Sequence, residues 1–275
     1  MNNGFQEIMC EKGLALSRIP LGDYVVNPYR GCFYGCHYCY VRRNKHVRKR
    51  AAAWGDFVDA KINIADVLQE EIPRLRPARV LIGSTTDVYQ PCEKEYGLSG
   101  KVLRCLNQHA VPVTVMTRSP LIVRDSDLLA DNPDPVVYFT VSPLPRGLRK
   151  KLEGRAPLNQ ERFRAVRALC QKGITVHVYA NPVFPVVSCP RYIVDQCGPH
   201  VRYLDFESVN PAMMDNGYVF ESLSGIPVPD RKKIIRIFTC KKAWDEYWGL
   251  MRAEVARLCH DRDLTTQIFF HPFSE

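Results

Sequence analysis

The chain has 275 residues, 46% of them hydrophobic, so it is long enough to form one large α/β domain with a buried core. No apolar run reaches the roughly 18 residues of a membrane span, and residues 1–20 lack the basic patch and apolar core of a signal peptide. We therefore expect a cytoplasmic protein with no membrane partner. The net charge of +9 favours anionic partners such as nucleic acid, although many soluble proteins are basic without binding it.

Strand-like and helix-like segments alternate along the chain. The predicted strands share short runs of apolar and β-branched residues: 23–31, 78–84, 111–117, 136–142, 174–182 and 201–208. The predicted helices share apolar residues at helical spacing: 63–75, 98–109 and 159–172. Asn63 and Ser99 are the expected N-caps of the first two helices, and Gly173 is expected to end the third.

This order of elements predicts βαβ units with parallel strands, which form either a wound sheet or a partial barrel. Apolar residues from Ala243 to Cys259 keep helical spacing, and we expect a helix that packs on the core. A platform of aromatic side chains for a substrate is the alternative for this segment.

Three of the eleven cysteines, Cys32, Cys36 and Cys39, stand close together in "GCFYGCHYCY". The total is odd and too low for a disulfide scaffold, so this group indicates metal or redox chemistry. A structural zinc site needs four ligands, usually from two separated pairs, and the sequence has no second pair of this kind. Three thiolates can instead hold a [4Fe–4S] cluster with one iron left open. We interpret the trio as cluster ligands, with a zinc site or unligated cysteines as the alternatives.

The other cysteines give weaker signals. Cys105 and Cys170 fall on apolar helix faces and are expected to be core residues. Four more have no recognisable spacing, so we expect no auxiliary cluster: Cys189, Cys197, Cys240 and Cys259.

The C-x3-C-x2-C motif, with Tyr38 before its last cysteine, resembles that of the radical S-adenosylmethionine superfamily. Five further stretches, in order, resemble the group related to spore photoproduct lyase, a DNA-repair lyase: "NPYRGCFYGCHYCYVR", "GSTTDVYQPCE", "TVMTRS", "RDSDLL" and "LEGRAP". The resemblance covers roughly residues 20 to 190.

The resemblance implies a partial (β/α)6 barrel of the TIM type over residues 21–230. An extension over 1–20 would precede it, and a helical segment over 231–275 would follow. Cys32, Cys36 and Cys39 would bind the cluster, and S-adenosylmethionine would chelate its open iron. An electron donor of the flavodoxin or ferredoxin type would reduce the cluster. The resulting 5′-deoxyadenosyl radical would take hydrogen from a substrate carbon.

Polar residues at the predicted strand ends are candidates to bind this cofactor. They are Ser84, Thr86, Asp87, Thr117, Arg118, Thr140, Ser142 and Asn181, together with Tyr38 beside the adenine. Arg118 matches a basic residue of the lyase and is expected to pair with the methionyl carboxylate. For each hydroxyl, a role in a turn or cap is the alternative.

The lyase returns hydrogen to its substrate from a cysteine near the end of the second strand, and tyrosines around the last cluster cysteine relay it. Tyr38 and Tyr40 match those tyrosines, but "GSTTD" has no cysteine. The nearest thiol, Cys92, is the candidate to replace it as the hydrogen donor, with a buried loop residue as the alternative. This difference leaves repair of thymine dimers in doubt and the generation of the radical untouched.

Two basic runs, 42–50 and 146–155, are candidates to contact substrate phosphates, and solvated helix faces are the alternative. Trp54 and Phe57 are expected in the core, with stacking on a base as the alternative. The leading hypothesis is a radical enzyme that acts on nucleic acid, a nucleotide or another anionic substrate. A radical enzyme that modifies a peptide or small metabolite is the second. A metal-bearing nucleic-acid-binding protein without catalysis is the third.

Overall fold

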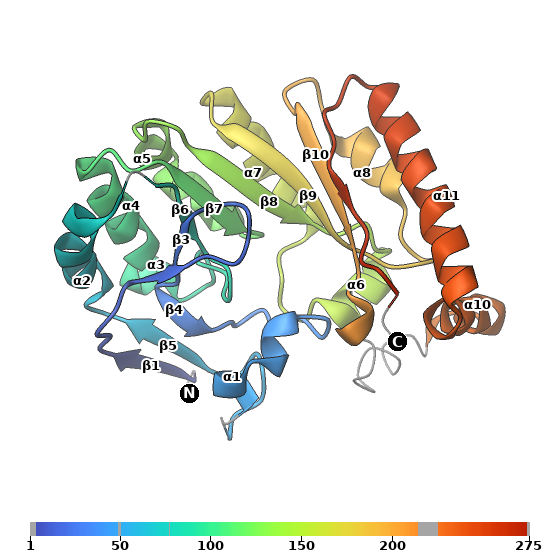
Figure 1. Cartoon of the computed structure of the whole chain (residues 1–275), viewed down its shortest axis with the longest axis horizontal. Helices are drawn as coiled ribbons and strands as arrows, with labels where there is room; N and C mark the ends of the chain where they lie inside the picture. The colour runs from blue at the N-terminus through green and yellow to red at the C-terminus, as the bar shows by residue number, and fades with distance from the viewer. Residues whose placement is uncertain (1–3, 49–50, 77, 214–224, 274–275) are drawn as a thin grey trace. The chain divides into compact units, whose positions relative to one another are not determined.

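The computed structural model describes residues 4–48, 51–76, 78–213 and 225–273 (Figure 1). The chain divides into two compact units, each made of several segments. Unit 1 contains Met1–Gly35, Val41–Phe139 and Ala156–Val176, and unit 2 contains Cys36–Tyr40, Thr140–Arg155 and His177–Glu275. Among the helices of the described residues, none has the length and apolar content of a membrane-spanning segment.

The main sheet of unit 1 is mostly parallel, as the alternation of segments predicts. Its strands are β2 (Leu14–Leu16), β3 (Tyr24–Val26), β6 (Val80–Ile82), β7 (Val113–Thr117) and β8 (Val136–Val141). β3, β6, β7 and β8 pair in parallel in that order, and β2 pairs antiparallel with β3. Every residue of β6 is buried, as expected for a parallel strand that is covered on both faces.

The three predicted helices of unit 1 are confirmed. They are α2 (Ile64–Glu71), α4 (Leu98–Gln108) and α7 (Asn159–Gln171). The short helices are α1 (Lys45–Arg48), α3 (Glu93–Tyr96) and α5 (Ser126–Ala130), with 3₁₀ turns at Tyr40–Arg43, Ile72–Arg74 and Pro120–Asp125. Figure 1 shows α2 and α4 side by side, and their buried faces include Leu68 and Val102. Gly173 ends α7 with a φ of 78°, a conformation that favours glycine.

Three details of these helices differ from the prediction. Ser99 is not the cap of α4, because Gly97 holds that position with a φ of 61° and the Ser99 hydroxyl donates to the Val88 carbonyl. Asn63 does precede α2, but its side chain bonds the backbone of Cys10 instead of the helix. Cys170 is half-buried, whereas Cys105 is a core residue as expected.

Segment 23–31, expected to be one strand, is two strands in different sheets. β3 belongs to the main sheet, and β4 (Tyr29–Gly31) pairs antiparallel with β5 (Val58–Lys61), which pairs in parallel with β1 (Phe5–Ile8). Pro28 lies between β3 and β4 and has no backbone N–H for a sheet ladder. Because the predicted strand 23–31 is divided, the cysteine loop follows β4 of the small sheet and not a strand of the main sheet.

Unit 2 contains a second parallel arrangement. β9 (Thr175–Val183), whose first two residues lie in unit 1, pairs with β10 (Tyr203–Ser208), and β10 pairs with β11 (Ile268–Phe269). The helices are α6 (Arg146–Leu152), α8 (Pro190–Gln196), α10 (Val228–Thr239) and α11 (Lys241–His260), with a 3₁₀ turn at Pro211–Met213.

The predicted C-terminal helix is confirmed as α11. It buries Trp244, Trp248 and Val255 and packs beside α8 (Figure 1). The described strands form open sheets and no closed barrel, in agreement with the predicted partial barrel.

Candidate functional site

The cysteine loop begins at a glycine that no other residue can replace without strain. Gly31 has a φ of 90°, and a Cβ atom there would lie 2.3 Å from the carbonyl oxygen of Phe57. Gly35 has a φ of 61°, and its Cβ atom would lie 3.1 Å from the Cα atom of Gly55. Both positions therefore need the freedom of glycine, and they let the loop run close to residues 54–57.

The three thiols of the loop lie on two successive turns. The Gly35 N–H donates to the Cys32 carbonyl at 3.3 Å, and the Cys39 N–H donates to the Cys36 carbonyl at 3.2 Å. Cys32 and Cys36 are buried and Cys39 is half-buried. In the described part of the chain, no three Cys, His, Asp or Glu side chains are arranged to hold a metal ion. The donor set of three thiols close together in sequence, two of them buried, fits an iron–sulfur cluster in its chemistry.

Thr86 and Gln90 anchor the start of this loop in unit 1. The Thr86 hydroxyl donates to the Gly31 carbonyl at 2.5 Å and accepts from the Gln90 amide at 3.0 Å. The Gln90 carboxamide oxygen accepts the Phe33 N–H at 2.8 Å, and its side chain is fully buried. Sequence reasoning proposed Thr86 for the cofactor and missed Gln90, although both lie in the "GSTTDVYQPCE" stretch.

Ser84 lies at the end of β6, where Asn27 holds the backbone. The Asn27 carboxamide oxygen accepts the N–H groups of Ser84 and Thr85 at 2.9 and 3.0 Å. Its amide nitrogen donates to the Ser84 hydroxyl at 3.1 Å. Asn27 was not predicted as a site residue, and it fixes the direction of the strand end.

Asp87 joins the ends of β6 and β7. Its carboxylate accepts from the Thr117 hydroxyl at 2.6 Å and from the N–H groups of Arg118 and Tyr89 at 2.9 and 3.0 Å. Burial raises the pKa of this carboxyl above its ordinary value, against the lowering effect of these hydrogen bonds. The structure thus brings four predicted residues of unit 1 to neighbouring strand ends: Ser84, Asp87, Thr117 and Arg118.

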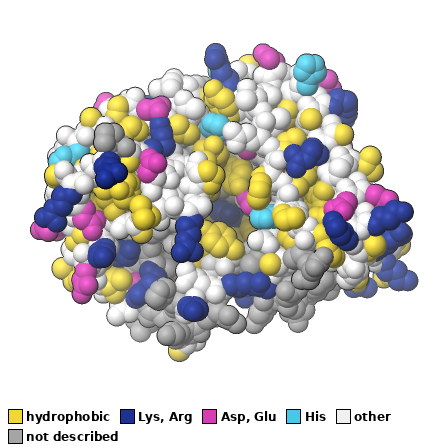
Figure 2. All heavy atoms as spheres, in the orientation of Figure 1, with side chains coloured by type: hydrophobic (Ala, Val, Ile, Leu, Met, Phe, Trp, Pro, Cys, Tyr) yellow, Lys and Arg dark blue, Asp and Glu magenta, His cyan; other side chains and the backbone are white. Residues whose placement is uncertain are grey.

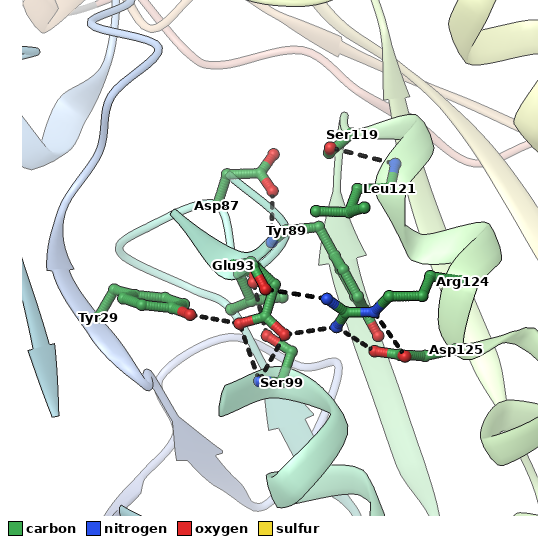
Figure 3. Close-up of polar contacts among 10 residues, drawn as sticks. Tyr29, Asp87, Tyr89, Glu93, Ser99, Ser119, Leu121, Arg124 and Asp125 are labelled. Atoms are coloured by element: carbon green, nitrogen blue, oxygen red, sulfur yellow. Dashed lines mark hydrogen bonds and ion pairs between the residues drawn. The ribbon is translucent and has the colours of Figure 1, made fainter. Parts of the chain in front are cut away.

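Glu93, beyond the strand end, is the centre of a buried ion-pair network (Figure 3). Its carboxylate accepts from the Tyr29 hydroxyl, the Ser99 N–H and the Arg124 guanidinium. Arg124 also pairs with Asp125 at 2.7 Å. Glu93 belongs to "GSTTDVYQPCE" and Arg124 to "RDSDLL", so this ion pair joins two of the noted stretches in the folded protein.

Cys92, the proposed hydrogen donor, immediately precedes α3. Its side chain is buried, and burial together with the neighbouring Glu93 raises the pKa of the thiol to about 12. The thiol therefore keeps its hydrogen near neutral pH.

In unit 2, Glu153 holds the second half of the cysteine loop. The Tyr38 hydroxyl donates to the Glu153 carboxylate at 2.6 Å, and the Cys36 thiol lies 3.8 Å from the Glu153 carbonyl oxygen. The His37 N–H donates to the Leu152 carbonyl at 2.8 Å. Glu153 is fully buried and belongs to "LEGRAP", which was the only sequence signal for it.

The remaining candidates also lie in unit 2. Thr140 and Ser142 are buried at the end of β8. Asn181, near the end of β9, donates to the carboxylate of Glu207. The Tyr40 side chain is half exposed, yet partial burial of its hydroxyl, with Cys39 and Glu207 nearby, raises its pKa to about 12. The predicted site residues thus form two groups, one in each unit.

Only some of the basic side chains in the two basic runs are exposed to solvent. Residues 49–50 and the side chains of His46 and Arg48 lie outside the described residues, whereas Arg43 and Lys45 are exposed. In the run 146–155 the exposed basic residues are Arg146, Lys150, Lys151 and Arg155. Arg149 is buried against Glu153 at 3.4 Å. Phe57 is a core residue, and Trp54 packs edge-on against it.

Comparison with known proteins identifies the family of this chain. The family model described as the radical SAM superfamily matches residues 26–188, and the chain belongs to this superfamily. An uncharacterized protein of Methanocaldococcus jannaschii is 29% identical over 206 residues, which cover 74% of this chain and 77% of the relative. An uncharacterized protein of Mycobacterium tuberculosis is 31% identical over 205 residues, which cover 70% of this chain and 59% of the relative.

Solved structures show the same fold. Spore photoproduct lyase complexed with dinucleoside spore photoproduct matches with a TM-score of 0.70 at 13% identity, over 97% of this chain and 82% of the lyase. SuiB of Streptococcus suis, bound to the precursor peptide SuiA, matches with a TM-score of 0.54 at 13% identity. That match covers 90% of this chain and about half, 48%, of SuiB. The predicted resemblance and the α/β fold with parallel strands are confirmed.

Proposed function

We propose that this protein is an enzyme that uses S-adenosylmethionine and a [4Fe–4S] cluster to remove hydrogen from a nucleic-acid-type substrate. The observation that carries the proposal is the cysteine loop of a radical SAM chain. Its three thiols, Cys32, Cys36 and Cys39, lie on two tight turns that Thr86, Gln90 and Glu153 anchor. A loop that is held so firmly, with three thiols and no fourth, suits a cluster with one open iron.

Cys32, Cys36 and Cys39 would hold the cluster. Once reduced by an electron donor of the flavodoxin or ferredoxin type, it would supply the electron that splits S-adenosylmethionine into methionine and a 5′-deoxyadenosyl radical.

The residues at the strand ends bind and orient the cofactor. In unit 1 the backbone around Ser84 and Asp87 is fixed by hydrogen bonds, so these groups are preorganised for an ammonium and a ribose. Arg118 takes the methionyl carboxylate. In unit 2 the corresponding groups are Thr140, Ser142 and Asn181, with the Tyr38 ring beside the adenine.

Charge favours a substrate that carries phosphate. The net charge is +9, and exposed cations lie on α6 and beside it. Helix α10 adds four basic residues that the sequence reasoning did not single out: Arg231, Lys232, Lys233 and Arg236. Figure 2 shows Lys and Arg side chains gathered at the right-hand edge, where Figure 1 places α10. Such cations attract a phosphate backbone without reading its sequence.

Return of hydrogen to the substrate requires a group that keeps its own hydrogen near neutral pH. The thiol of Cys92 does so, because burial beside Glu93 raises its pKa to about 12. The Tyr40 side chain is half exposed and is therefore open to a substrate. The Tyr38 hydroxyl is engaged by Glu153 at 2.6 Å. We therefore assign Tyr38 to holding the loop and favour Tyr40 as the relay.

The test is anaerobic reconstitution with iron and sulfide, followed by dithionite and S-adenosylmethionine, with 5′-deoxyadenosine measured by chromatography. We expect the wild type to release 5′-deoxyadenosine and Cys36→Ala to release none. Cys189→Ala, which removes an exposed cysteine outside the loop, is the matched control and should behave as the wild type. A reconstituted wild type that forms no 5′-deoxyadenosine would falsify the proposal, and a colourless protein with one bound zinc would favour a non-catalytic metal-bearing protein.

A second candidate is a radical enzyme that modifies a peptide, because SuiB, with a similar fold, is bound to a precursor peptide. Failure of the protein to bind DNA or RNA at low salt would favour this candidate over the nucleic-acid substrate.

A further inference from the structure

One face of β9 and β10 in unit 2 carries polar side chains only. Along β9 the side chains of Val178 and Ala180 are buried, and the alternate positions face the other side of the sheet. Those alternate positions are His177, Tyr179 and Asn181 on β9, with Tyr203, Asp205 and Glu207 on β10. The two sets are in register, since Tyr203 is opposite His177 and Asp205 is opposite Tyr179. No family stretch noted in the sequence includes these residues.

The first carboxylate on this face, Asp205, is satisfied within the protein. It contacts the ring nitrogen Nδ1 of His177 at 2.7 Å and accepts the Gln267 N–H at 2.8 Å. The His177 ring stacks on Tyr203 with centroids 4.4 Å apart. Asp205 is only 4% exposed, so this pair fixes the strands and offers little to a ligand.

The second carboxylate, Glu207, remains accessible. It accepts from the Tyr179 hydroxyl and the Asn181 amide, and His271 Nε2 lies 2.9 Å from its other oxygen. Its side chain is 20% exposed, and no Lys or Arg of the described residues forms an ion pair with it. Three neighbouring donors, from Tyr179, Asn181 and His271, point at the carboxylate, so the partly exposed group at the centre of this arrangement is an acceptor.

An acceptor-rich group without a cation repels phosphate and carboxylate and suits a neutral N–H donor. Glu207 and Asn181 lie near the carboxyl ends of parallel strands, the edge at which such sheets bind ligands. The same unit contains Cys36–Tyr40, the second half of the cysteine loop.

We propose that Glu207, held by Tyr179, Asn181 and His271, binds the ring N–H of a nucleobase in the substrate. Thymine, uracil and guanine carry such a group. The inference rests on the proposed function for its nucleic-acid substrate and adds the chemistry by which the base is recognised. The basic residues of α6 and α10 would bind the phosphates, and Glu207 would recognise the edge of the base.

The test is a binding measurement, so it is separate from the formation of 5′-deoxyadenosine. The probes are thymidylyl-thymidine, which has a ring N–H on each base, and the same dinucleotide methylated at N3 of both bases. The protein is the full chain after anaerobic reconstitution, titrated calorimetrically without S-adenosylmethionine. We expect methylation to weaken binding to the wild type at least about tenfold, because it removes the ring N–H donor and places a methyl group against a charged acceptor.

Glu207→Gln should weaken binding of the unmethylated dinucleotide about tenfold and remove the difference between the two probes. Asp205→Asn is the matched control, because it removes a carboxylate two residues before Glu207 on the same face. This variant should still bind the unmethylated dinucleotide more tightly than the methylated one. Equal binding of both probes by the wild type would overturn the proposal without any variant. So would unchanged binding by Glu207→Gln, or binding of a lysine-rich peptide in place of either dinucleotide. If instead the proposed function were wrong, the wild type would bind the probes but form no 5′-deoxyadenosine.

Discussion

Two glutamates, Glu93 in unit 1 and Glu207 in unit 2, have opposite environments. Glu93 is fully buried and is neutralised by Arg124, with Tyr29 and Ser99 as further donors. Glu207 is 20% exposed and is held by neutral donors and by His271. A buried carboxylate needs a cation and full hydrogen bonding, whereas a partly exposed one can remain available to a ligand.

The number of hydrogen bonds does not distinguish the two carboxylates. Both glutamates accept several. The difference lies in the cation and in the access of solvent, so Glu93 is expected to stabilise the fold and Glu207 to bind a ligand.

The largest expected effect on stability is that of Glu93→Ala. It leaves Tyr29 and part of Arg124 without a partner in the core, and removal of one member of a buried pair costs about 3–5 kcal/mol of unfolding free energy. Urea unfolding measures this loss. Asp127→Ala, which breaks an exposed ion pair with Lys172, is the control and should change the free energy by less than about 1 kcal/mol. If Glu93→Ala and Asp127→Ala lost the same unfolding free energy, the buried ion pair of Glu93 would not stabilise the fold more than an exposed one.

The next effect is that of Gly31→Ala at the start of the cysteine loop. The added Cβ atom would lie 2.3 Å from the Phe57 carbonyl oxygen at a φ of 90°. We expect a loss of about 1–3 kcal/mol and less iron bound after reconstitution. Gly147→Ala on α6 has no atom within 4 Å of its new Cβ and is the control. Normal iron binding by Gly31→Ala would show that the loop does not need this conformation.

A smaller effect is expected for the stability of Glu207→Ala. The donors of Tyr179 and Asn181 lose their partner but lie in a half-buried place that water can reach, so the cost should be about 1 kcal/mol. The same urea experiment as for Glu93→Ala gives the direct comparison. A loss as large as that of Glu93→Ala would make Glu207 a structural residue.

The last prediction is that the Cys92 thiol does not react with an alkylating reagent in the folded protein. Because the pKa of its thiol is raised to about 12, the group stays protonated as the pH rises to about 9, and the reactive thiolate does not form. Iodoacetamide and mass spectrometry should show Cys189 modified and Cys92 intact in the folded protein, with both modified in urea. Rapid modification of Cys92 in the folded protein would contradict its closed environment beside Glu93.

Much of the fold could be predicted from the sequence because β6 to β10 are short apolar runs between amphipathic helices. The sheet of β1, β5 and β4 was missed, since "FQEI" and "VDAK" are too short and too polar to indicate strands. The break at Pro28 was also missed, because apolar residues continue on both sides of it.

The cysteine trio could be singled out in the sequence because the proposed cluster chemistry requires a local spacing of thiols. Gln90, Glu153 and Glu207 were not, because each acts through a contact that only folding creates. Gln90 reaches Phe33, 57 residues away in sequence, and Glu153 reaches Tyr38, 115 residues away. The polar face of β9 and β10 alternates with buried residues, but the function proposed for it depends on a contact with His271 beyond β11.

The central claim is that Cys32, Cys36 and Cys39 hold a [4Fe–4S] cluster and leave one iron for S-adenosylmethionine. Electron paramagnetic resonance of the dithionite-reduced protein, with and without S-adenosylmethionine, tests it most directly. We predict about four irons per chain and the signal of a reduced cluster, with g values that change when S-adenosylmethionine is added. A signal that S-adenosylmethionine leaves unaltered, or a protein with one zinc and no iron, would contradict the account.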